Sequence, residues 1–437
     1  MNSSRTRRAL LAAVGVAALA LPLAACSSGG DDGGSGATTI TFLTSNQPVD
    51  VELAERLIEA FGKDNPEIEI NHQTQPAGTE GDNLNKTKLS TGEMEDLFYY
   101  NSGSLLQVLN PDQTLVNLAD EEWVGDLTDA MKTVVSTDNG LYGTPLGASQ
   151  GGAILYNKKV YDELGLTVPT SWAEFEANNE KVKAAGKTAV IQTYGDDWTS
   201  QLFVLGDFAN VAAQDADWAT DYTAGEKKYA DQPAFQSFLN QQEAHDKGWM
   251  NADFASATLD DGLRLLATGE GVHFPMLTGT MSTIQQNYPD NVNDIGIFAI
   301  PAEDAADTRL TVWLPNAVYI PKTTEGAKLE AAKKFVAFIN SPEGCEVQAS
   351  GATPAGPFAT SACSLPDDVP PFLTDMQEYV DSGNSGPALE FLSPIKGPNM
   401  PGILVEVGSG IRSAEDGAKL YDEDVKKQAQ QLGLEGW

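Results

Sequence analysis

The first regular pattern of apolar and polar residues covers residues 39–44, where the two kinds alternate. Such alternation predicts a β-strand. Leu53, Leu57 and Phe61 then recur at the spacing of one helix face, and residues 68–70 alternate again. A strand, a helix and a strand at this spacing predict a βαβ unit with a parallel strand pair and a right-handed crossover.

The same two patterns continue along the rest of the chain. Short apolar runs typical of buried strands occur at residues 96–100, 154–156, 190–191 and 295–298, and helical stripes occur at residues 331–339 and 419–431. Ser171, with Glu174 three residues later, has the capping-box pattern and predicts a helix that continues to about residue 186. Because strands and helices alternate, the sequence predicts an α/β fold class.

The chain has 437 residues and a formal net charge of −35, with 62 acidic and 27 basic side chains. A field of this sign disfavours nucleic acid and anionic membrane surfaces as partners. The charge keeps a surface protein soluble and does not identify a ligand. A chain of this length exceeds what one compact core holds, so we expect two lobes.

The amino end has the parts of a secretory signal. Three arginines within the first eight residues precede an uncharged, Ala- and Leu-rich run at residues 9–25, and Cys26 follows it. This run is shorter than the about 20 residues of a membrane span. The small residues before Cys26 make the segment resemble a bacterial lipoprotein signal, which implies removal of residues 1–25 and acylation of Cys26. The alternative is an ordinary signal peptide in which the cysteine has no role.

Residues 26–38, rich in Gly and Ser, cannot bury a core and predict a flexible tether. We therefore expect an extracytoplasmic protein that contacts the membrane only through the lipid on Cys26. In that compartment Cys345 and Cys363, which flank a Gly-, Pro- and Ala-rich loop, are expected to form a disulfide. The alternative is two unpaired buried thiols.

Five segments carry a resemblance to one family. They are LAERLIEAFGKDNP at residues 53–66, STGEMEDLFYY at 90–100, GLYGTPLGASQGGAILYNK at 140–158, VPTSWAEF at 168–175 and AAKKFVAFINSP at 331–342. In this order they resemble segments of the extracellular solute-binding proteins of family 1, the maltose-binding-protein-like group that serves sugar importers.

The resemblance implies the two-lobed periplasmic-binding-protein-like fold, with a hinge and a central ligand cleft. Carried onto this chain, it assigns residues 39–146 and 301–351 to lobe 1, and residues 147–300 and 352–437 to lobe 2. It further implies a monomer that captures a mono- or oligosaccharide and delivers it to the membrane permease subunits of an ABC transporter. In such proteins the lobes close around the ligand.

A sugar presents hydroxyl groups at its rim and C–H groups on its faces, so its site needs aromatic rings and short polar side chains. Trp198, beside Asp197, has this chemistry after a predicted strand, and core packing is its alternative role. Trp313 and Asn316 lie on the segment that resembles the family's return into lobe 1.

Six more candidates have polar side chains beside or within predicted strands and the hinge motif: Asn46, Gln47, Asn101, Ser102, Tyr156 and Thr280. The first four follow strands, at the edge where open α/β sheets hold ligands, and turn formation is the alternative. Thr280 precedes Met281, which stands where relatives often have a tryptophan. The size of the sugar therefore stays open.

Other chemistries find little support. His72, His245 and His273 have no partners at metal-ligand spacing, so no metal or cofactor is expected. No nucleophile-elbow, Walker or dinucleotide motif occurs in a fitting context, so we expect a binding protein rather than an enzyme. Two alternatives remain: the same scaffold with a peptide, polyamine or organic anion as ligand, and a secreted glycosidase.

Overall fold

The structure is a computed structural model that describes residues 37–76, 79–351, 354–366 and 368–437. The expected signal peptide, Cys26 and the tether up to residue 36 lie outside the described residues. Within the described ranges, no helix has both the length and the apolar character that a membrane span requires.

Strands and helices alternate, as the sequence predicts. The strands are β1 (Thr38–Ser45), β2 (Ile68–Gln75), β3 (Leu97–Tyr100), β4 (Ser136–Thr137), β5 (Gly140–Leu141), β6 (Gly143–Pro145), β7 (Gln150–Asn157), β8 (Thr188–Val190), β9 (Gly271–Leu277), β10 (Ile295–Ala299), β11 (Leu310–Trp313), β12 (Ala317–Tyr319) and β13 (Ser385–Pro387). The helices of the first half are α1 (Pro48–Asp64), α2 (Thr79–Thr91), α3 (Ser104–Val108), α4 (Pro111–Thr114), α5 (Asp129–Val134), α6 (Lys158–Leu164), α7 (Trp172–Ala184), α8 (Leu202–Leu205), α9 (Phe208–Gln214) and α10 (Trp218–Thr223). The remaining helices are α11 (Phe235–Asp246), α12 (Leu259–Thr268), α13 (Met281–Asn287), α14 (Gly326–Ile339), α15 (Pro342–Ser350), α16 (Pro371–Asp381), α17 (Leu389–Leu392), α18 (Met400–Gly408) and α19 (Ala414–Gln431).

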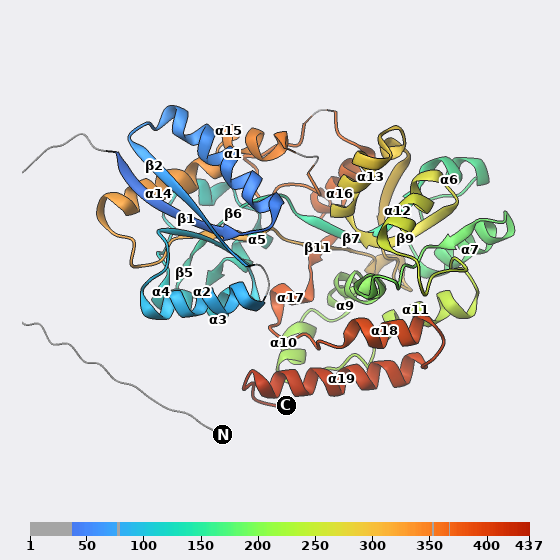
Figure 1. The fold of residues 1–437 in the computed structure, drawn as a ribbon. Coiled ribbons are helices and arrows are strands. Elements are labelled where there is room, and N and C mark those ends of the chain that lie inside the picture. The colour runs from blue at the N-terminus through green and yellow to red at the C-terminus, as the bar shows by residue number, and fades with distance from the viewer. Residues whose placement is uncertain (1–36, 77–78, 352–353, 367) are drawn as a thin grey trace, which may run out of the picture. The chain divides into compact units, whose positions relative to one another are not determined.

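The first sheet has the strand order β2-β1-β3-β12-β6, and we call the elements packed on it the first lobe. β1 pairs in parallel with β2 and β3, which confirms the predicted βαβ unit, while β12 is antiparallel to its neighbours. α1 and α14 pack against this sheet (Figure 1). Phe42, Phe61 and Phe335 meet edge to face in the core between them, which is a favoured arrangement of aromatic rings.

The second sheet has the order β13-β11-β7-β9-β8, with β10 also paired to β7, and its elements form the second lobe. β7 is the central strand, and it is antiparallel to β9, β10 and β11. Buried apolar side chains of α6 and α7 pack against β7, β8 and β9. Helices α11, α18 and α19 contact one another in a separate core at the carboxyl end of the chain (Figure 1).

The expected return to the first lobe at residue 301 is wrong. Residues 310–313 form β11, which pairs with β7 of the second sheet, so the chain returns between Trp313 and Ala317. The sequence misled us because the strong apolar run at residues 295–298 is followed by a proline, whereas β11 is short and ends in a polar turn. The chain therefore passes from the second sheet to the first directly after β11, a strand of four residues that the alternation of apolar and polar residues did not predict.

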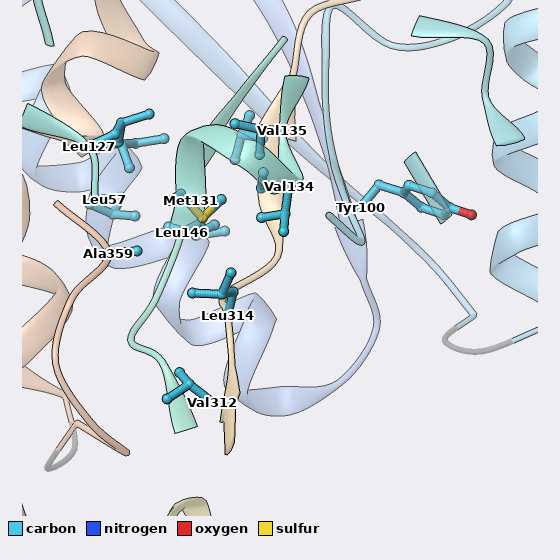
Figure 2. Packing of buried hydrophobic residues seen from close by; sticks show 14 of the residues in the cluster. Leu57, Tyr100, Leu127, Met131, Val134, Val135, Leu146, Val312, Leu314 and Ala359 are labelled. Carbon is cyan, nitrogen blue, oxygen red and sulfur yellow. The ribbon is translucent and has the colours of Figure 1, made fainter. Parts of the chain in front are cut away.

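Three chain segments cross between the lobes side by side. Leu146 donates its backbone N–H to the Asn316 carbonyl at 3.0 Å, and Ser149 donates to the Pro357 carbonyl at 2.9 Å. Leu146, Val312, Leu314 and Ala359 belong to one buried apolar cluster there (Figure 2). The three crossing segments are therefore joined to one another by backbone hydrogen bonds and apolar packing, and together they form the hinge region.

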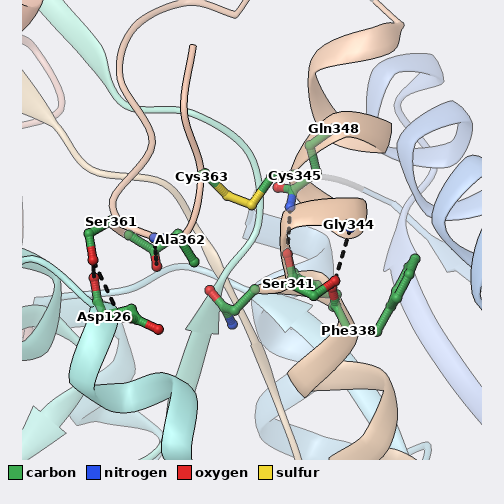
Figure 3. The surroundings of a disulfide bond; sticks show 12 residues. Asp126, Phe338, Ser341, Gly344, Cys345, Gln348, Ser361, Ala362 and Cys363 are labelled. Atoms are coloured by element: carbon green, nitrogen blue, oxygen red, sulfur yellow. Dashed lines mark hydrogen bonds between the residues drawn. A yellow bond between two sulfur atoms is a disulfide. The ribbon is translucent and has the colours of Figure 1, made fainter. Parts of the chain in front are cut away.

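The third crossing is tied back to the first lobe. Cys345 on α15 and Cys363 are joined by a disulfide, with their Cα atoms 5.1 Å apart (Figure 3). Nearby, Thr128 donates to the Ala359 carbonyl at 3.0 Å and Ser361 donates to the Asp126 carbonyl at 2.7 Å. The expected change of lobe at residue 352 is therefore too early, because the chain stays attached to the first lobe through about residue 363.

Candidate ligand-binding cleft

A cleft of about 640 Å³ lies where β1 and β3 end, beside the crossing segments. Its lining comes from four parts of the chain: the start of α1, the loop and helix after β3, the first two crossings, and the segment around α17. These residues are Gln47, Val49, Asp50, Leu53, Tyr99, Asn101, Ser102, Ser104, Leu105, Leu146, Gly147, Ala148, Gln150, Trp313, Leu314, Pro315, Asn316, Glu390, Phe391, Ser393, Pro394 and Lys396. The volume falls within the range of small-molecule sites.

A smaller chamber of about 220 Å³ adjoins this cleft on the first lobe. It shares five lining residues with the cleft, which are Gln47, Asp50, Tyr99, Asn101 and Asn316. The rest of its lining comes from the ends of β1, β2 and β3 and from α2: Ser45, Gln75, Pro76, Gly81, Asp82, Asn85 and Tyr100. Carboxylates, amides and hydroxyls dominate this wall, so the inner chamber offers hydrogen bonds on most sides.

Two carboxyl groups of the inner chamber are partly withdrawn from water. Burial raises the pKa of Asp50, against a lowering contribution from the Ser45 hydroxyl that bonds to it. Burial also raises the pKa of Asp82, which Lys86 and the Tyr100 hydroxyl oppose. A ligand that donates hydrogen bonds or carries positive charge would therefore stabilise the ionised form of both carboxyl groups.

Gln75 brings a buried polar atom into the chamber that is not satisfied within the fold. The Gln75 amide donates to Asn85 Oδ1 at 2.8 Å, but Gln75 Oε1 is buried without a hydrogen-bond partner in the described part of the chain. A buried acceptor left unpaired costs free energy, and a ligand hydroxyl or amine can satisfy it.

The outer cleft supplies rings and apolar surface. Trp313 and Phe391 line it, and Tyr99 lines both it and the inner chamber. Phe391 lies on α17, whose backbone is held against α3 because the Ser104 hydroxyl donates to the Glu390 carbonyl at 2.5 Å. Rings and amides on several sides can bind the C–H faces and the hydroxyl rim of a sugar together.

Five of the predicted site residues line the cleft: Gln47, Asn101, Ser102, Trp313 and Asn316. All five lie at strand ends or in the crossings, where polar exits were expected to hold a ligand. Ser102 is buried and also donates to the Pro315 carbonyl at 3.0 Å, so its hydroxyl has a structural use as well.

The other five candidates lie outside the cleft. Asn46 is exposed beside it, and Thr280 donates to the Leu277 carbonyl at 2.8 Å. Tyr156 is buried and packs against Tyr161 and Phe298, with ring centroids 4.4 and 5.3 Å away. A strand residue on the covered face of β7 belongs to the core.

Asp197 and Trp198 lie in a short 3-10 helix, Asp197–Gln201, that packs against α18. Both side chains are exposed, and 37% of Trp198 is accessible, so core packing does not account for this tryptophan. Met281, by contrast, is fully buried and lies in the apolar core.

Several cleft residues escaped the sequence reasoning. They are Asp50, Tyr99, Gln150, Glu390, Phe391, Lys396 and the inner-chamber residues Gln75, Asp82 and Asn85. The end of β2 was a usable signal, because it belongs to the same sheet edge as the ends of β1 and β3. Nothing in the sequence indicated that α17 reaches across to α3.

The buried histidine, His273, is bonded within the fold. His273 is buried, with Nδ1 donating to Asn179 at 2.8 Å and Nε2 bonded to the Tyr161 hydroxyl at 2.7 Å. Burial lowers the pKa of His273 to about 3, so the ring stays neutral. Within the described ranges, no group of three or more metal-binding side chains is present.

Comparison with known sequences finds one family over most of the chain. Residues 56–371 match the family described as bacterial extracellular solute-binding protein. The chain is 25% identical over 310 residues to the multiple sugar-binding protein of Streptococcus mutans, covering 69% of this chain and 71% of that protein. It is 22% identical over 348 residues to the melibiose/raffinose/stachyose-binding protein MelE of Bacillus subtilis, covering 77% and 78%.

Solved structures share the fold. The apo form of RafE from Streptococcus pneumoniae aligns with a TM-score of 0.75 at 20% identity, over 91% of this chain and 99% of that one. RafE in complex with raffinose aligns with a TM-score of 0.71 at 19% identity, over 90% and 100%. These likenesses confirm the two-lobed α/β architecture.

Proposed function

This chain belongs to the bacterial extracellular solute-binding protein family, and on that premise we propose that it captures an oligosaccharide in its cleft and delivers it to an ABC importer. The observation that carries the proposal is the lining of the cleft: rings on the outer side and an amide- and carboxylate-rich chamber within. Two curated relatives are named for sugars, and a structural neighbour was solved with raffinose, which supports the same ligand class.

Closure of the two lobes would complete the site. Trp198 and Asp197 are exposed on the second lobe and do not line the cleft as it stands. We place them as contacts that form when the hinge closes on a bound sugar, because a ligand held by both lobes favours the closed state. Asn46 and Thr280, which are not among the lining residues, belong to the same proposal.

The importer partner, the anchor and the assembly state complete the proposal. We propose that Cys26 is lipidated, that the protein acts outside the cytoplasm as a monomer, and that ABC permease subunits recognise the closed form. The Cys345–Cys363 disulfide suits an oxidising compartment. Mass spectrometry of the protein from its native membrane tests the anchor, since lipidation adds the mass of the acyl groups to a peptide that begins at Cys26.

Titration calorimetry of the purified protein against melibiose, raffinose, stachyose and single hexoses tests the ligand class. We expect saturable binding to at least one oligosaccharide and recovery of that sugar unchanged, as a binding protein requires. Asn316→Ala, in the lining of both chambers, should weaken binding, whereas Ser282→Ala, on the exposed surface, should not. Absence of binding to every sugar contradicts the proposal, and steady release of shorter products indicates a glycosidase.

A cationic solute is the second candidate. Asp50 and Asp82 line the inner chamber, and its lining residues include no lysine, arginine or histidine. Two partly buried carboxylates favour a positively charged guest, although Lys86 already offsets part of the charge of Asp82. Putrescine and spermidine therefore belong in the same panel. Binding of a polyamine with no response to sugars would assign the cleft to that class.

A further inference from the structure

Trp313 ends β11 at the point where the chain leaves the second sheet, and it lines the cleft. β11 lies antiparallel to β7, with Trp313 opposite Gln150 and Thr311 opposite Gly152. The tryptophan is only half-buried. Whether its ring stays where a ligand can meet it therefore depends on what the covered part of the indole rests against.

The indole of Trp313 occupies space that is free because Gly152 has no side chain. A Cβ atom on Gly152 would lie 2.3 Å from Cζ3 and 3.0 Å from Cη2 of Trp313. Real Cβ atoms essentially never approach a neighbour that closely, so a side chain at position 152 forces something to shift. The same Cβ would also lie 3.3 Å from the Cα atom of Gly206.

The backbone at Gly206 is fixed, so the indole is the part that must yield. The Thr311 hydroxyl donates to the Gly206 carbonyl at 2.6 Å and accepts from the Ala209 backbone N–H at 2.9 Å. These bonds tie the turn between α8 and α9 to β11. A side chain on Gly152 would then push the six-membered ring of Trp313 out of its place.

We propose that Gly152 is a positioning residue for ligand binding: it holds the Trp313 ring where a sugar unit stacks against it. The inference rests on the proposed function for its ligand. The packing of the Trp313 ring over Gly152, which we call the seat, is a property of the unliganded protein. Gly152 does not touch the ligand. Its effect on affinity passes through the ring alone.

Neighbouring Gly151 provides a matched control. A Cβ atom on Gly151 would find its closest neighbour, Thr278 Cγ2, at 3.4 Å, which is ordinary van der Waals contact. Gly151→Ala and Gly152→Ala therefore add the same methyl group to adjacent residues of one strand, and only the second meets the indole.

The test is a double-mutant cycle with Gly152→Ala, Trp313→Phe, both together, and the control Gly151→Ala. Calorimetry with raffinose and stachyose gives the dissociation constants. We expect Gly152→Ala to weaken binding up to about tenfold, the size of one lost ring contact. In the Trp313→Phe background it should have no further effect, because Cζ3 and Cη2 are gone. Gly151→Ala should stay within about twofold of the wild type.

A second readout does not need a sugar. The indole N–H resonance of Trp313 in ¹⁵N-labelled protein, assigned by its loss in Trp313→Phe, should move in Gly152→Ala and stay in place in Gly151→Ala. If the wild type binds no sugar while this resonance moves, the proposed function fails and the seat stands. If Gly152→Ala alone does not fold, recovery of folding in the double variant supports the seat.

Three results overturn the inference. The first is an unmoved Trp313 resonance in Gly152→Ala. The second is wild-type affinity in Gly152→Ala, or losses of affinity that multiply in the double variant. The third is failure of the double variant to fold, which would place the clash with the Gly206 backbone rather than with the ring.

Discussion

Single residues of the cleft divide into those bonded within the fold and those left for a ligand. The Tyr319 hydroxyl donates to the Asn101 carbonyl at 3.0 Å, which fixes the exit of β3 against β12. The side-chain amide of Asn101 has no partner within the described ranges, although it lines both chambers. Asn101 was predictable from the sequence, because polar residues that follow parallel strands lie at the same edge of the sheet. It missed Asp50 and Gln75 because no pattern separates a cleft residue from a solvated one.

Trp198 can be tested for a ligand contact, because its ring is exposed and does not line the cleft. If closure brings a sugar against its exposed ring, Trp198→Ala should weaken binding by about 1–3 kcal/mol. Thermal stability should change little, because the side chain is already 37% exposed. Calorimetry and a melting curve on the same variant check both points. Ile411→Ala, at a large apolar side chain that is 74% exposed, serves as the control, and unchanged affinity for Trp198→Ala contradicts the assignment.

Asp207 should make stability depend on pH. Burial raises the pKa of this carboxyl to about 7, against the Asn210 amide that bonds to it. Its pKa in the unfolded chain is about 3.9. Folding thus favours the protonated form, so its stabilising contribution is complete below about pH 4 and is lost as the pH rises through 7.

The measurement is urea unfolding of unliganded protein at pH 4.5, 6 and 7.5. Asp207→Asn keeps a neutral group, so its free energy of unfolding should fall less with rising pH than that of the wild type, by at most about 4 kcal/mol. Asp422, whose pKa burial raises to about 6, contributes in the same direction in both proteins. Asp290→Asn, on the surface, should follow the wild type, and parallel profiles for Asp207→Asn would contradict the expectation.

At the scale of elements, the strongest periodic segments were predictable. The stripe of Leu53, Leu57 and Phe61 became α1, and the Ser171 cap starts α7, where its hydroxyl accepts from the Glu174 N–H. The short elements were not predictable. β11, β13 and α17 have three or four residues each and no periodicity of their own, so they form because tertiary contacts position them.

A cap that the sequence patterns did not bring out offers an element-scale test. Thr258 begins α12 with a reciprocal capping box: its hydroxyl accepts from the Asp261 N–H, and the Asp261 carboxylate accepts from the Thr258 N–H at 2.9 Å. Thr258→Ala should lower the free energy of unfolding by about 1 kcal/mol. Thr268→Ala, on the exposed side at the other end of α12, should cost less. Equal effects in urea titrations would deny the cap its role.

For the whole molecule, the disulfide should matter to stability more than to binding. Cys345 and Cys363 are 18 residues apart and lie outside the cleft lining. Replacing both by serine should lower the free energy of unfolding by about 3 kcal/mol, mainly by freeing the unfolded chain. A reductant should destabilise the wild type by a similar amount and leave the variant unchanged. Two titratable thiols in the untreated wild type, beyond Cys26, would contradict the pairing.

The hinge gives a test that compares two glycines with positive φ angles, one inside a crossing and one outside. Gly147, in the first crossing, has φ +96, and Gly165, which ends α6, has φ +61; at both, the space that a Cβ atom would take has no neighbour within 4 Å. Alanine at either site should therefore destabilise through backbone strain alone, by about 1 kcal/mol. Only Gly147→Ala should also change sugar affinity, because Gly147 lies in a crossing between the lobes and lines the cleft, whereas Gly165 does neither. Matching affinities for the two variants would contradict this.

The bonded crossings have one more consequence. Asn316 and Gly147 lie both in the crossings and in the wall of the cleft, so a ligand bound there would contact the segments about which the proposed closure turns. A small rotation of the backbone in the crossings would displace the outer edges of the lobes by a much larger distance, because these edges lie far from the crossings. Binding would therefore change the surface that a transporter recognises through small backbone rotations in the crossings, although that surface does not contact the sugar.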